Sequence, residues 1–473
     1  MKVEVRNPRT GEADHVIEVA GADEVAAVVS SLRSTQGDWE ALGVEGRAGV
    51  LGRWAEAIGH RRAEIVDALV ADTGRLGESH MEVDAVVGSI HRWRALGPSL
   101  LSEEGLRPAS AIPGVAVGQG FRPHPVVGVI SPWNFPFLLS VIDAIPALVA
   151  GCAVVVKPSE VAPRFVDAVA ASVADVPEMA GVLVYVVGDG STGAAVVDHV
   201  DCVCFTGSVA TGRQVGLRAA ERFIPAFLEL GGKDAAIVLA SADLDRASSA
   251  ILWGGTANCG QSCQSIERVY VARPVADDFV GRLVEKAEAV ALAVPSPADG
   301  TIGPIIAEDQ IGIISDHLAD AVAKGADVRC GGEIEVHGGG SYLRPTVLTG
   351  VDHSMKVMTE ETFGPILPVM EVDGADDAVA MANDTVYGLS AAVFAGTDDE
   401  ALSVARRLDA GGISINDAAL TALVFDGEKQ SFKLSGLGGS RMGPSALRRF
   451  GRRQAYLVSQ ATAPDPWWYP HLR

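Results

Sequence analysis

The chain of 473 residues carries a formal net charge of −22 and is 48% hydrophobic. This length allows two or three domains with a large core, and the acidic charge argues against nucleic acid, which binds through lysine and arginine. Six cysteines without a paired CxxC pattern indicate a reducing compartment rather than disulfides or a metal site, so we expect a cytoplasmic protein.

Neither export nor a membrane partner is expected. Residues 1–8 lack the apolar core of a signal peptide. The most apolar region, residues 126–156, is broken by Pro132, Asp143 and Pro146. Such breaks favour a buried strand, turn and helix over a bilayer span.

The N-terminal part of the chain is predicted to be helical. Alanine, valine, arginine and glutamate recur at helical spacing in residues 23–34, 46–59, 61–73 and 78–96. Residues 114–125 then alternate in character and contain several glycines, which is typical of an extended hairpin.

From residue 126 onward, strand-like runs alternate with helix-like ones. The predicted strands are residues 126–130, 153–156, 182–187, 202–205 and 235–239. This alternation predicts a doubly wound parallel sheet, whose ligands bind beyond the carboxyl ends of the strands.

A second α/β series follows residue 263. It contains the runs 269–275 and 342–348, predicted helices at 276–290 and 310–324, a predicted strand at 366–372, and a turn-rich link at 383–390. We place a domain boundary near Gly231-Gly232, so that residues before and after it would face each other across a cleft.

Glu229 and Cys263 bracket one predicted βα unit, made of the strand at 235–239 and a helix-like run at 246–254. A thiolate is a strong nucleophile and a carboxylate can activate water, so the pair suggests covalent catalysis. On these residues alone it is equally open that Glu229 is a surface acid and Cys263 a small buried apolar residue.

The run Gly188-Asp189-Gly190-Ser191-Thr192-Gly193 matches the GxGxxG pattern of a dinucleotide-binding turn. It does not follow the first strand of its unit, however, and no acidic residue lies about 20 positions further on. The turn Thr206-Gly207-Ser208, with Gly212 in the next helix-like run, is an equal candidate for binding phosphate at a helix start.

Six short motifs resemble those of the aldehyde dehydrogenase superfamily. They are Ser131-Pro132-Trp133-Asn134-Phe135-Pro136, Lys157-Pro158-Ser159-Glu160, Phe205-Thr206-Gly207-Ser208, Glu229-Leu230-Gly231-Gly232-Lys233, Gly260-Gln261-Ser262-Cys263 and Glu361-Thr362-Phe363-Gly364-Pro365. Each is a weak signal alone, but their shared order and spacing argue against chance. The resemblance extends from about Asn7 to Val458.

The resemblance implies two doubly wound α/β domains, a Rossmann-like cofactor domain and a catalytic domain, plus a small β oligomerisation hairpin. Residues 1–112 and 126–231 would form the NAD-binding domain, residues 232–440 the catalytic domain, and residues 113–125 and 453–473 the oligomerisation segments. It also implies an NAD-dependent oxidoreductase of the EC 1.2.1 type that converts an aldehyde to a carboxylic acid.

Carried over position by position, Cys263 matches the family's nucleophile, Glu229 its general base, and Asn134 the amide that holds the oxyanion together with the Cys263 backbone N–H. Attack of the thiolate on the aldehyde would give a thiohemiacetal. Hydride transfer to the nicotinamide would convert it to a thioester, and water activated by Glu229 would hydrolyse the thioester to the acid. A donor fixed where the oxyanion develops can contribute about 3 kcal/mol.

Cofactor residues implied by the resemblance come from both domains. Lys157 and Glu160 match residues that hold the adenosine ribose, and the Glu160 carboxylate would repel a 2′-phosphate, which favours NAD, although relatives with this acid can also accept NADP. The other matching positions are Trp133, Gly188, Gly207, Ser208, Gly212, Leu230, Glu361 and Phe363. Glu361 and Phe363 could instead be a tight turn with one buried aromatic ring.

The C-terminal region departs from the family. Many members carry a proline, a phenylalanine and two glycines before Lys-x-Ser-Gly, whereas this chain has Gln430-Ser431-Phe432-Lys433-Leu434-Ser435-Gly436. Candidates for an apolar substrate funnel are Phe135, Leu138, Leu139, Phe425 and Phe432. Because no cation flanks Cys263, we expect an aromatic or medium aliphatic aldehyde rather than a short semialdehyde that bears a carboxylate.

The aromatic tail Pro466-Trp467-Trp468-Tyr469-Pro470 would be costly to expose. We expect it to pack with residues 114–125 on a neighbouring subunit of a homodimer or homotetramer, a substrate lid being the alternative. Three other functions stay open: a CoA-acylating aldehyde dehydrogenase, against which Glu229 argues, a cofactor-independent cysteine hydrolase, and a catalytically silent binding protein.

Overall fold

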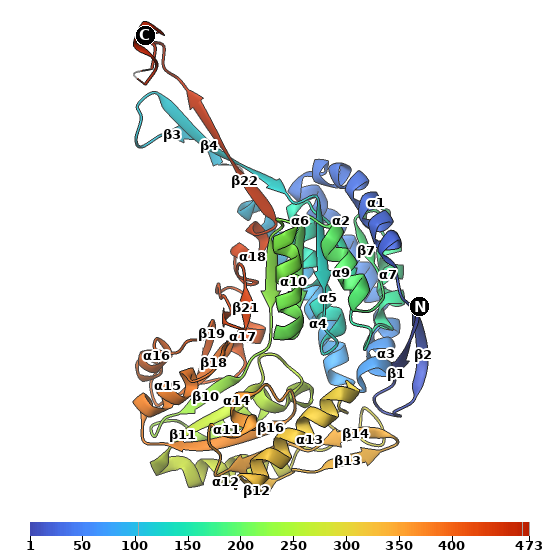
Figure 1. Ribbon diagram of the computed structural model, residues 1–473, viewed down its shortest axis with the longest axis vertical. Coiled ribbons are helices and arrows are strands. Elements are labelled where there is room, and N and C mark those ends of the chain that lie inside the picture. Colours follow the sequence, from blue (N-terminus) through green and yellow to red (C-terminus); the bar gives the residue numbers. More distant parts are fainter. Residues whose placement is uncertain (103, 466, 473) are drawn as a thin grey trace.

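The computed structural model describes residues 1–102, 104–465 and 467–472. The body contains two mostly parallel sheets with helices packed on them, and an arm of antiparallel strands projects from it with the C-terminus near its tip (Figure 1). This architecture confirms the predicted fold class. Pro466 and Arg473, which belong to the predicted oligomerisation tail, lie outside the described residues.

Four long helices follow a short N-terminal hairpin of β1 (Lys2–Arg6) and β2 (Ala13–Glu18). They are α1 (Ala22–Ala41), α2 (Gly43–His60), α3 (Arg62–Thr73) and α4 (Gly77–Leu100), which confirms the predicted helical region. Trp39 and Trp54 are buried beneath them, and each indole N–H donates a hydrogen bond, to Leu148 O at 2.9 Å and to Ser172 Oγ at 3.1 Å respectively.

The first sheet has the strand order β21–β9–β8–β5–β6–β7. Its parallel strands are β5 (Val126–Ile130), β6 (Ala153–Lys157), β7 (Leu183–Tyr185), β8 (Cys202–Thr206) and β9 (Ala226–Glu229). The chain runs outward from β5 to β6 and β7 and then returns to β8 on the other side of β5. Doubly wound folds bind their ligands at such a reversal, here between β5 and β8.

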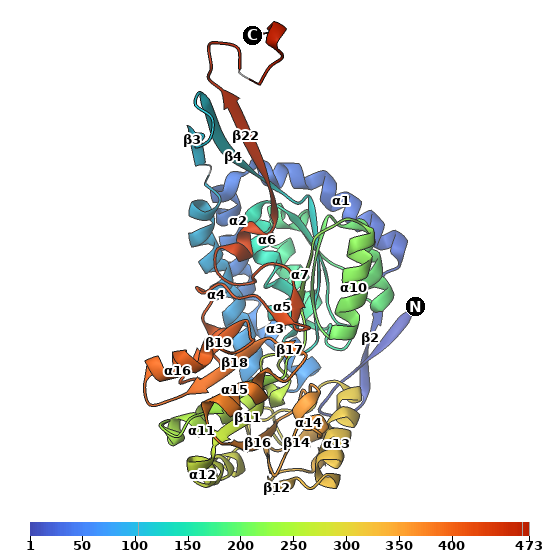
Figure 2. The same ribbon diagram turned by 60° about the vertical axis from the view of Figure 1, so that its left-hand side comes forward.

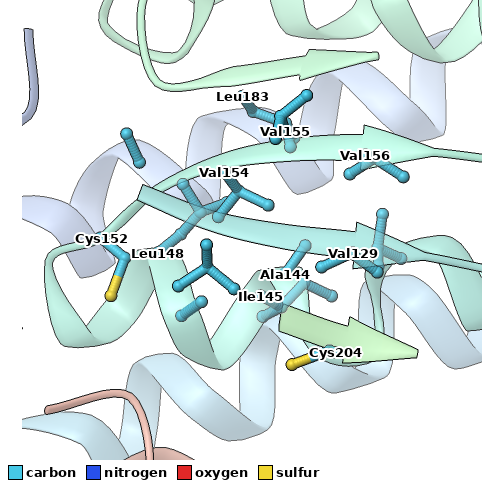
Figure 3. Packing of buried hydrophobic residues seen from close by; sticks show 14 of the residues in the cluster. Val129, Ala144, Ile145, Leu148, Cys152, Val154, Val155, Val156, Leu183 and Cys204 are labelled. Atoms are coloured by element: carbon cyan, nitrogen blue, oxygen red, sulfur yellow. The ribbon is translucent and has the colours of Figure 1, made fainter. Parts of the chain in front are cut away.

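The helices around this sheet are α5 (Pro136–Val141), α6 (Ala144–Ala150), α7 (Phe165–Ala174), α8 (Pro177–Ala180), α9 (Gly190–His199) and α10 (Val209–Glu221). Every residue of β5 and β6 is buried, and Figure 3 shows Val129 and Val154 beside Ile145 and Leu148 of α6. Parallel strands covered on both faces require continuous apolar runs, which explains the high hydropathy of residues 126–156. No helix within the described ranges is long and apolar enough to cross a membrane.

The second sheet has the order β12–β15–β16–β11–β10–β18–β19. These strands are β10 (Asp234–Val238), β11 (Ile266–Ala272), β12 (Asp327–Cys330), β15 (Thr346–Thr349), β16 (Ile366–Val372), β18 (Ser390–Phe394) and β19 (Gly412–Ile415). Around them lie α11 (Leu244–Thr256), α12 (Ala276–Glu288), α13 (Glu308–Ala323), α14 (Lys356–Thr359), α15 (Ala375–Asn383), α16 (Asp398–Ala405) and α17 (Leu420–Leu423). A small hairpin of β13 (Ile334–His337) and β14 (Gly340–Leu343) is appended.

The structure adds detail that the sequence analysis of this second series lacked. The run 342–348 is divided between β14 and β15, because Arg344 and Pro345 interrupt it. The strand β18, which lies between β10 and the edge strand β19, was missed, since its first three residues, Ser390, Ala391 and Ala392, are small and lack the branched side chains that mark a strand. Residues 436–437, which we assigned to the catalytic domain, form β21 (Gly436–Leu437) at the edge of the first sheet.

The predicted hairpin at 114–125 is wrong. Those residues form one strand, β4 (Val115–Pro123), paired with β22 (Gly451–Ser459) on one side and β3 (Glu104–Pro108) on the other. A side chain at Gly120 would clash with the Tyr456 ring, so this glycine permits close packing rather than a turn. Figure 2 shows β4 and β22 leaving the body together.

Candidate active site

The chain crosses from one sheet to the other beside the predicted catalytic residues. Glu229 ends β9, and β10 begins at Asp234. A Cβ atom on Gly231 would clash with the Glu361 carboxylate, and one on Gly232 would clash with the Cys263 carbonyl oxygen. Glycine is therefore required at position 232, where the approach is to backbone, and a side chain at position 231 would displace the Glu361 carboxylate.

A network of amides holds the loop that carries Cys263. The loop follows α11 and η1 (Ala257–Gly260), in which Asn258 and Cys259 have left-handed φ angles of 54° and 57°. The Asn258 side chain donates to the carbonyl oxygens of Asn134 and Gln261, both at 2.9 Å. The Gln261 side chain donates to Asn258 O at 3.0 Å and accepts from the Ile306 N–H at 2.8 Å. Surrounding bonds of this kind can maintain a strained backbone.

Asn134 is bound into the same network. Its side-chain nitrogen donates to Gln261 O at 3.0 Å, and the residue is almost fully buried. A carboxamide has two N–H bonds, so one donor remains after this hydrogen bond is made. The amide nitrogen of Asn134 is thus directed toward the loop that carries Cys263.

The Cys263 thiol is held in its protonated form. Burial raises its pKa to about 12; the positive charge of Lys429 opposes this shift, and the charges of Glu361, Asp234 and Glu229 add to it. At neutral pH attack by this sulfur therefore requires removal of its proton. No cation flanks Cys263 along the chain, but the charge of Lys429 acts on its thiol in the fold, which sequence reasoning missed.

Glu229 lies between two groups that sequence reasoning did not identify. Ser431 Oγ donates to its carboxylate at 2.7 Å. Arg441 donates to Asp143 at 2.8 Å and to Thr206 Oγ1 at 2.6 Å. Burial lowers the pKa of Arg441, but the charges of Asp143 and Glu229 outweigh it, so this guanidinium stays positive beside the Glu229 carboxylate.

The loop at 361–363 is anchored from the strands of the second sheet. Glu361 Oε1 accepts from the Gly232 N–H at 3.0 Å, and burial, followed by the charge of Glu267, raises the pKa of Glu361 to about 8. The Glu267 carboxylate accepts from the N–H groups of Thr362 at 2.7 Å and Phe363 at 2.8 Å. The Phe363 ring meets the Trp133 ring edge-on, with 5.4 Å between centroids. Glu267 was missed because it lies inside a strand, β11.

The remaining cofactor candidates cluster at the carboxyl ends of β6 and β8. The Lys157 ammonium donates to the Glu160 carboxylate at 2.7 Å. Ser208 caps α10 by accepting from the Thr211 N–H at 3.3 Å. Gly212 lies against Leu230, since a Cβ there would clash with the Leu230 side chain.

Gly188 has a simpler structural explanation. A Cβ at this position would clash with Thr192 Oγ1, and Asp189 caps α9 by accepting from the Ser191 N–H at 2.8 Å. Close packing and a helix cap account for these residues of the GxGxxG pattern.

Two of the aromatic funnel candidates lie beside arginines, of which Arg75 is buried and Arg92 half-buried. The Arg75 guanidinium lies 4.6 Å from the centre of the Phe135 ring, and the Arg92 guanidinium lies 4.2 Å from that of Phe425. Leu138 and Leu139 are half-buried on α5, whereas Phe432, in the short strand β20 (Phe432–Lys433), is 44% exposed. Neither arginine was singled out from the sequence.

The fold is an α/β fold with two mostly parallel sheets, in which the Asn134 amide donates to the loop that carries Cys263 and Glu229 ends the strand from which the chain crosses to the second sheet. The profile of the aldehyde dehydrogenase family matches residues 1–455. The chain belongs to the aldehyde dehydrogenase family, a family of oxidoreductases, which confirms the resemblance inferred from the six motifs.

Individual relatives agree with this assignment. A Mycolicibacterium smegmatis protein described as a succinate-semialdehyde dehydrogenase [NADP(+)] is 37% identical over 464 residues, covering 97% of this chain and 89% of the relative. The structure of PutA from Anabaena variabilis, assigned as an aldehyde dehydrogenase, is 57% identical and superposes with a TM-score of 0.97, covering 99% of this chain and 100% of the other. Betaine aldehyde dehydrogenase from Staphylococcus aureus in complex with NAD+ is 28% identical, with a TM-score of 0.91 and coverage of 99% and 94%.

Proposed function

We propose that the protein oxidises an aldehyde to the carboxylic acid, using Cys263 as nucleophile, Asn134 as oxyanion donor and Glu229 as general base. Two observations support this proposal: the Asn134 side chain donates to the carbonyl oxygen of Gln261, two residues before Cys263, at 3.0 Å, and the charge of Glu229 contributes to the raised pKa of the Cys263 thiol. Each of the three residues supplies one element that acyl chemistry on sulfur requires.

In the first step the Cys263 sulfur attacks the carbonyl carbon after losing its proton. Negative charge then develops on the carbonyl oxygen, where the Asn134 amide and the Cys263 backbone N–H would stabilise it. Because the amide network fixes Asn134 before substrate arrives, little reorganisation is needed at the transition state. The product of this step is a thiohemiacetal on Cys263.

In the last step a water molecule attacks the thioester left on Cys263 after oxidation. Glu229 would remove the proton of this water. Ser431 fixes the carboxylate by donating to one oxygen, which leaves the other oxygen with acceptor capacity. The acid is then released and the thiol restored.

The residues at the carboxyl ends of β6 and β8 fit a dinucleotide. The Glu160 carboxylate and Lys157 ammonium offer an acceptor and a donor for a ribose, and the α10 N-terminus with Gly207 and Ser208 suits phosphate. A bound nicotinamide would accept a hydride from the substrate carbon. We propose that the protein uses NAD and can also use NADP. The name of the M. smegmatis relative includes NADP(+), and the S. aureus complex contains NAD+.

We propose that the substrate is an aromatic or medium aliphatic aldehyde. The preference for aromatic or medium aliphatic aldehydes rests on the apolar side chains of Phe135, Leu138, Leu139, Phe425 and Phe432. The name of the M. smegmatis relative, by contrast, includes a semialdehyde that bears a carboxylate. Substrate screens therefore need both classes.

We also propose that the arm mediates a homodimer or homotetramer in the cytoplasm. It exposes large apolar side chains that water does not favour, among them Leu106, Ile112, Leu457, Trp467 and Tyr469. Deletion of residues 460–473, measured by light scattering after size exclusion, is expected to reduce the mass of the assembly. An unchanged mass would remove the tail from the interface.

The activity is tested by following NADH and NADPH absorbance with aromatic, aliphatic and carboxylate-bearing aldehydes. Reduction of the cofactor, with one acid formed per turnover, is the expected result. Cofactor reduction that requires coenzyme A would instead indicate an acylating enzyme. Ester hydrolysis without cofactor would indicate a cysteine hydrolase, and no turnover with any substrate would indicate a silent binding protein.

A further inference from the structure

Lys429 lies on a segment, residues 421–431, that connects the nucleophile to the general base. At its start, Thr421 Oγ1 donates to Oε1 of Gln264, the neighbour of Cys263, at 2.7 Å. At its end, Ser431 Oγ donates to Glu229 at 2.7 Å. This segment therefore forms one wall of the site, which we call the 421–431 wall.

The Lys429 side chain is turned into the protein. Only 9% of its surface is exposed, its backbone N–H donates to Ser440 Oγ at 3.0 Å, and a Cβ on Gly412 would lie 3.0 Å from its Cδ. Its Nζ atom is buried, and among the described residues it has no hydrogen-bond partner. Burial raises the pKa of both Cys263 and Asp234, and the Lys429 charge opposes both shifts.

The carboxylates whose charges act on Cys263 already accept hydrogen bonds from other groups. Both oxygens of Asp234 accept from Ser390, one from its N–H at 3.1 Å and the other from its hydroxyl. Glu361 accepts from the Gly232 N–H, and Glu229 accepts from Ser431. A buried ammonium without a hydrogen-bonded counter-charge is costly, so a ligand that supplies one would be favoured here.

We propose that Lys429 binds an anionic group, of the carboxylate type, carried by the aldehyde that Cys263 attacks. Lys429 is then a specificity-determining residue, and it selects the charge of the substrate rather than the aromatic or aliphatic nature of its chain. The inference rests on the proposed function and extends it by naming the substrate class. Because the segment that carries Lys429 is hydrogen-bonded to Gln264, the neighbour of Cys263, and to Glu229, a substrate bound to Lys429 would present its aldehyde to the sulfur.

The test compares aldehydes matched except for charge. Two pairs suffice: 4-carboxybenzaldehyde with methyl 4-formylbenzoate, and succinic semialdehyde with its methyl ester. For the wild-type enzyme kcat/KM should be higher for the acid of each pair. In Lys429→Met the acid-to-ester ratio of kcat/KM should fall about 10- to 100-fold, mainly through KM, as expected for loss of a hydrogen bond to a charged group.

Two controls separate substrate binding from a general structural role. Lys429→Arg should recover part of the ratio because it restores the charge, and Lys324→Met, an exposed lysine on the second domain, should leave it unchanged. Equal losses for acid and ester in Lys429→Met, or a wild-type ratio of one or below, would overturn the proposal.

A second measurement needs no variant. Succinate and terephthalate should slow alkylation of wild-type Cys263 by iodoacetamide, and the corresponding diamides should not. Equal protection by acids and diamides, or protection by neither, would contradict binding at Lys429. Failure of the proposed function looks different, because then no aldehyde of either charge would reduce the cofactor.

Discussion

The two walls of the site are built differently. The wall formed by Asn134 and the cysteine loop is tied by several buried amide hydrogen bonds, and its backbone includes two left-handed residues. The 421–431 wall is attached to the catalytic residues through Thr421 and Ser431 and carries an ammonium without a hydrogen-bond partner among the described residues. The wall that contains Asn134 is preorganised, whereas the 421–431 wall carries a cation that can still bind a ligand.

This difference suggests that one wall serves catalysis and the other serves substrate selection. Groups that stabilise charge at the reacting atoms must be held in place before the reaction, because reorganisation would cost transition-state stabilisation. Groups that select a substrate need only bind the part of it that lies away from the reacting atoms. Variants of the first wall should therefore reduce turnover of every aldehyde, and variants of the second should mainly change which aldehydes are used.

The largest effect is expected for Cys263→Ala. Cofactor reduction should fall by more than about 10,000-fold for all aldehydes, because the covalent intermediate cannot form. Stopped-flow absorbance measures the loss, and calorimetry should show cofactor affinity within a few-fold of wild type. Cys330→Ala, which removes a half-buried thiol near Pro345, serves as the control and should remain active. Retained turnover in Cys263→Ala would contradict the assignment of Cys263 as the nucleophile.

The raised pKa of the Cys263 thiol predicts a steep pH dependence. Since burial raises this pKa to about 12, the thiolate fraction of the resting enzyme should grow about tenfold per pH unit between pH 7 and 10. The rate of iodoacetamide labelling, followed by mass spectrometry of the peptide that contains Cys263, should increase about 1,000-fold over that range. A plateau below pH 9 would show that the resting thiol is more acidic than its surroundings imply.

Glu229→Gln should separate oxidation from hydrolysis. One equivalent of NADH should appear in a burst, and the steady rate should then fall about 100- to 1,000-fold because water is no longer activated. Glu221→Gln, an exposed acid in the last turn of α10, is the matched control. An undiminished steady rate would assign the base to another residue.

Asn134→Ala should lower kcat by about 100-fold while the backbone N–H of Cys263 continues to stabilise the oxyanion. The loss should be similar for the acid and the ester of each substrate pair, because the amide acts on the carbonyl oxygen that they share. A loss confined to one charge class would place Asn134 in specificity and contradict the division between the walls.

The smallest effect is expected for Ser431→Ala. Loss of one hydrogen bond to Glu229 should slow steady turnover about fivefold or more, with the burst retained. Comparison with Ser262→Ala, measured in the same burst experiment, shows whether the effect is specific to the hydrolysis step. A loss of the burst itself would mean that the 421–431 wall also contributes to attack.

Much of the fold was predictable because its signals are local. The strands at 126–130 and 366–372 match the observed bounds, since a continuous apolar run of strand length has few alternatives once helices flank it. β18 was not predicted because it begins with small side chains, which pack well between neighbouring strands but do not by themselves favour a strand. The hairpin at 114–125 was wrong because glycine permits either a turn or close packing, and only the neighbouring strand decides between them.

The sequence by itself determined the family, the order of the α/β units and the three residues proposed for catalysis, because those residues occur in short motifs that remain recognisable in one dimension. The tertiary structure alone decided what surrounds them. Lys429 and Cys263 lie 166 positions apart in the printed sequence, and Arg441 and Glu229 lie 212 apart. Charge acts through space, so a cation that is absent beside Cys263 along the chain still acts on its thiol in the fold.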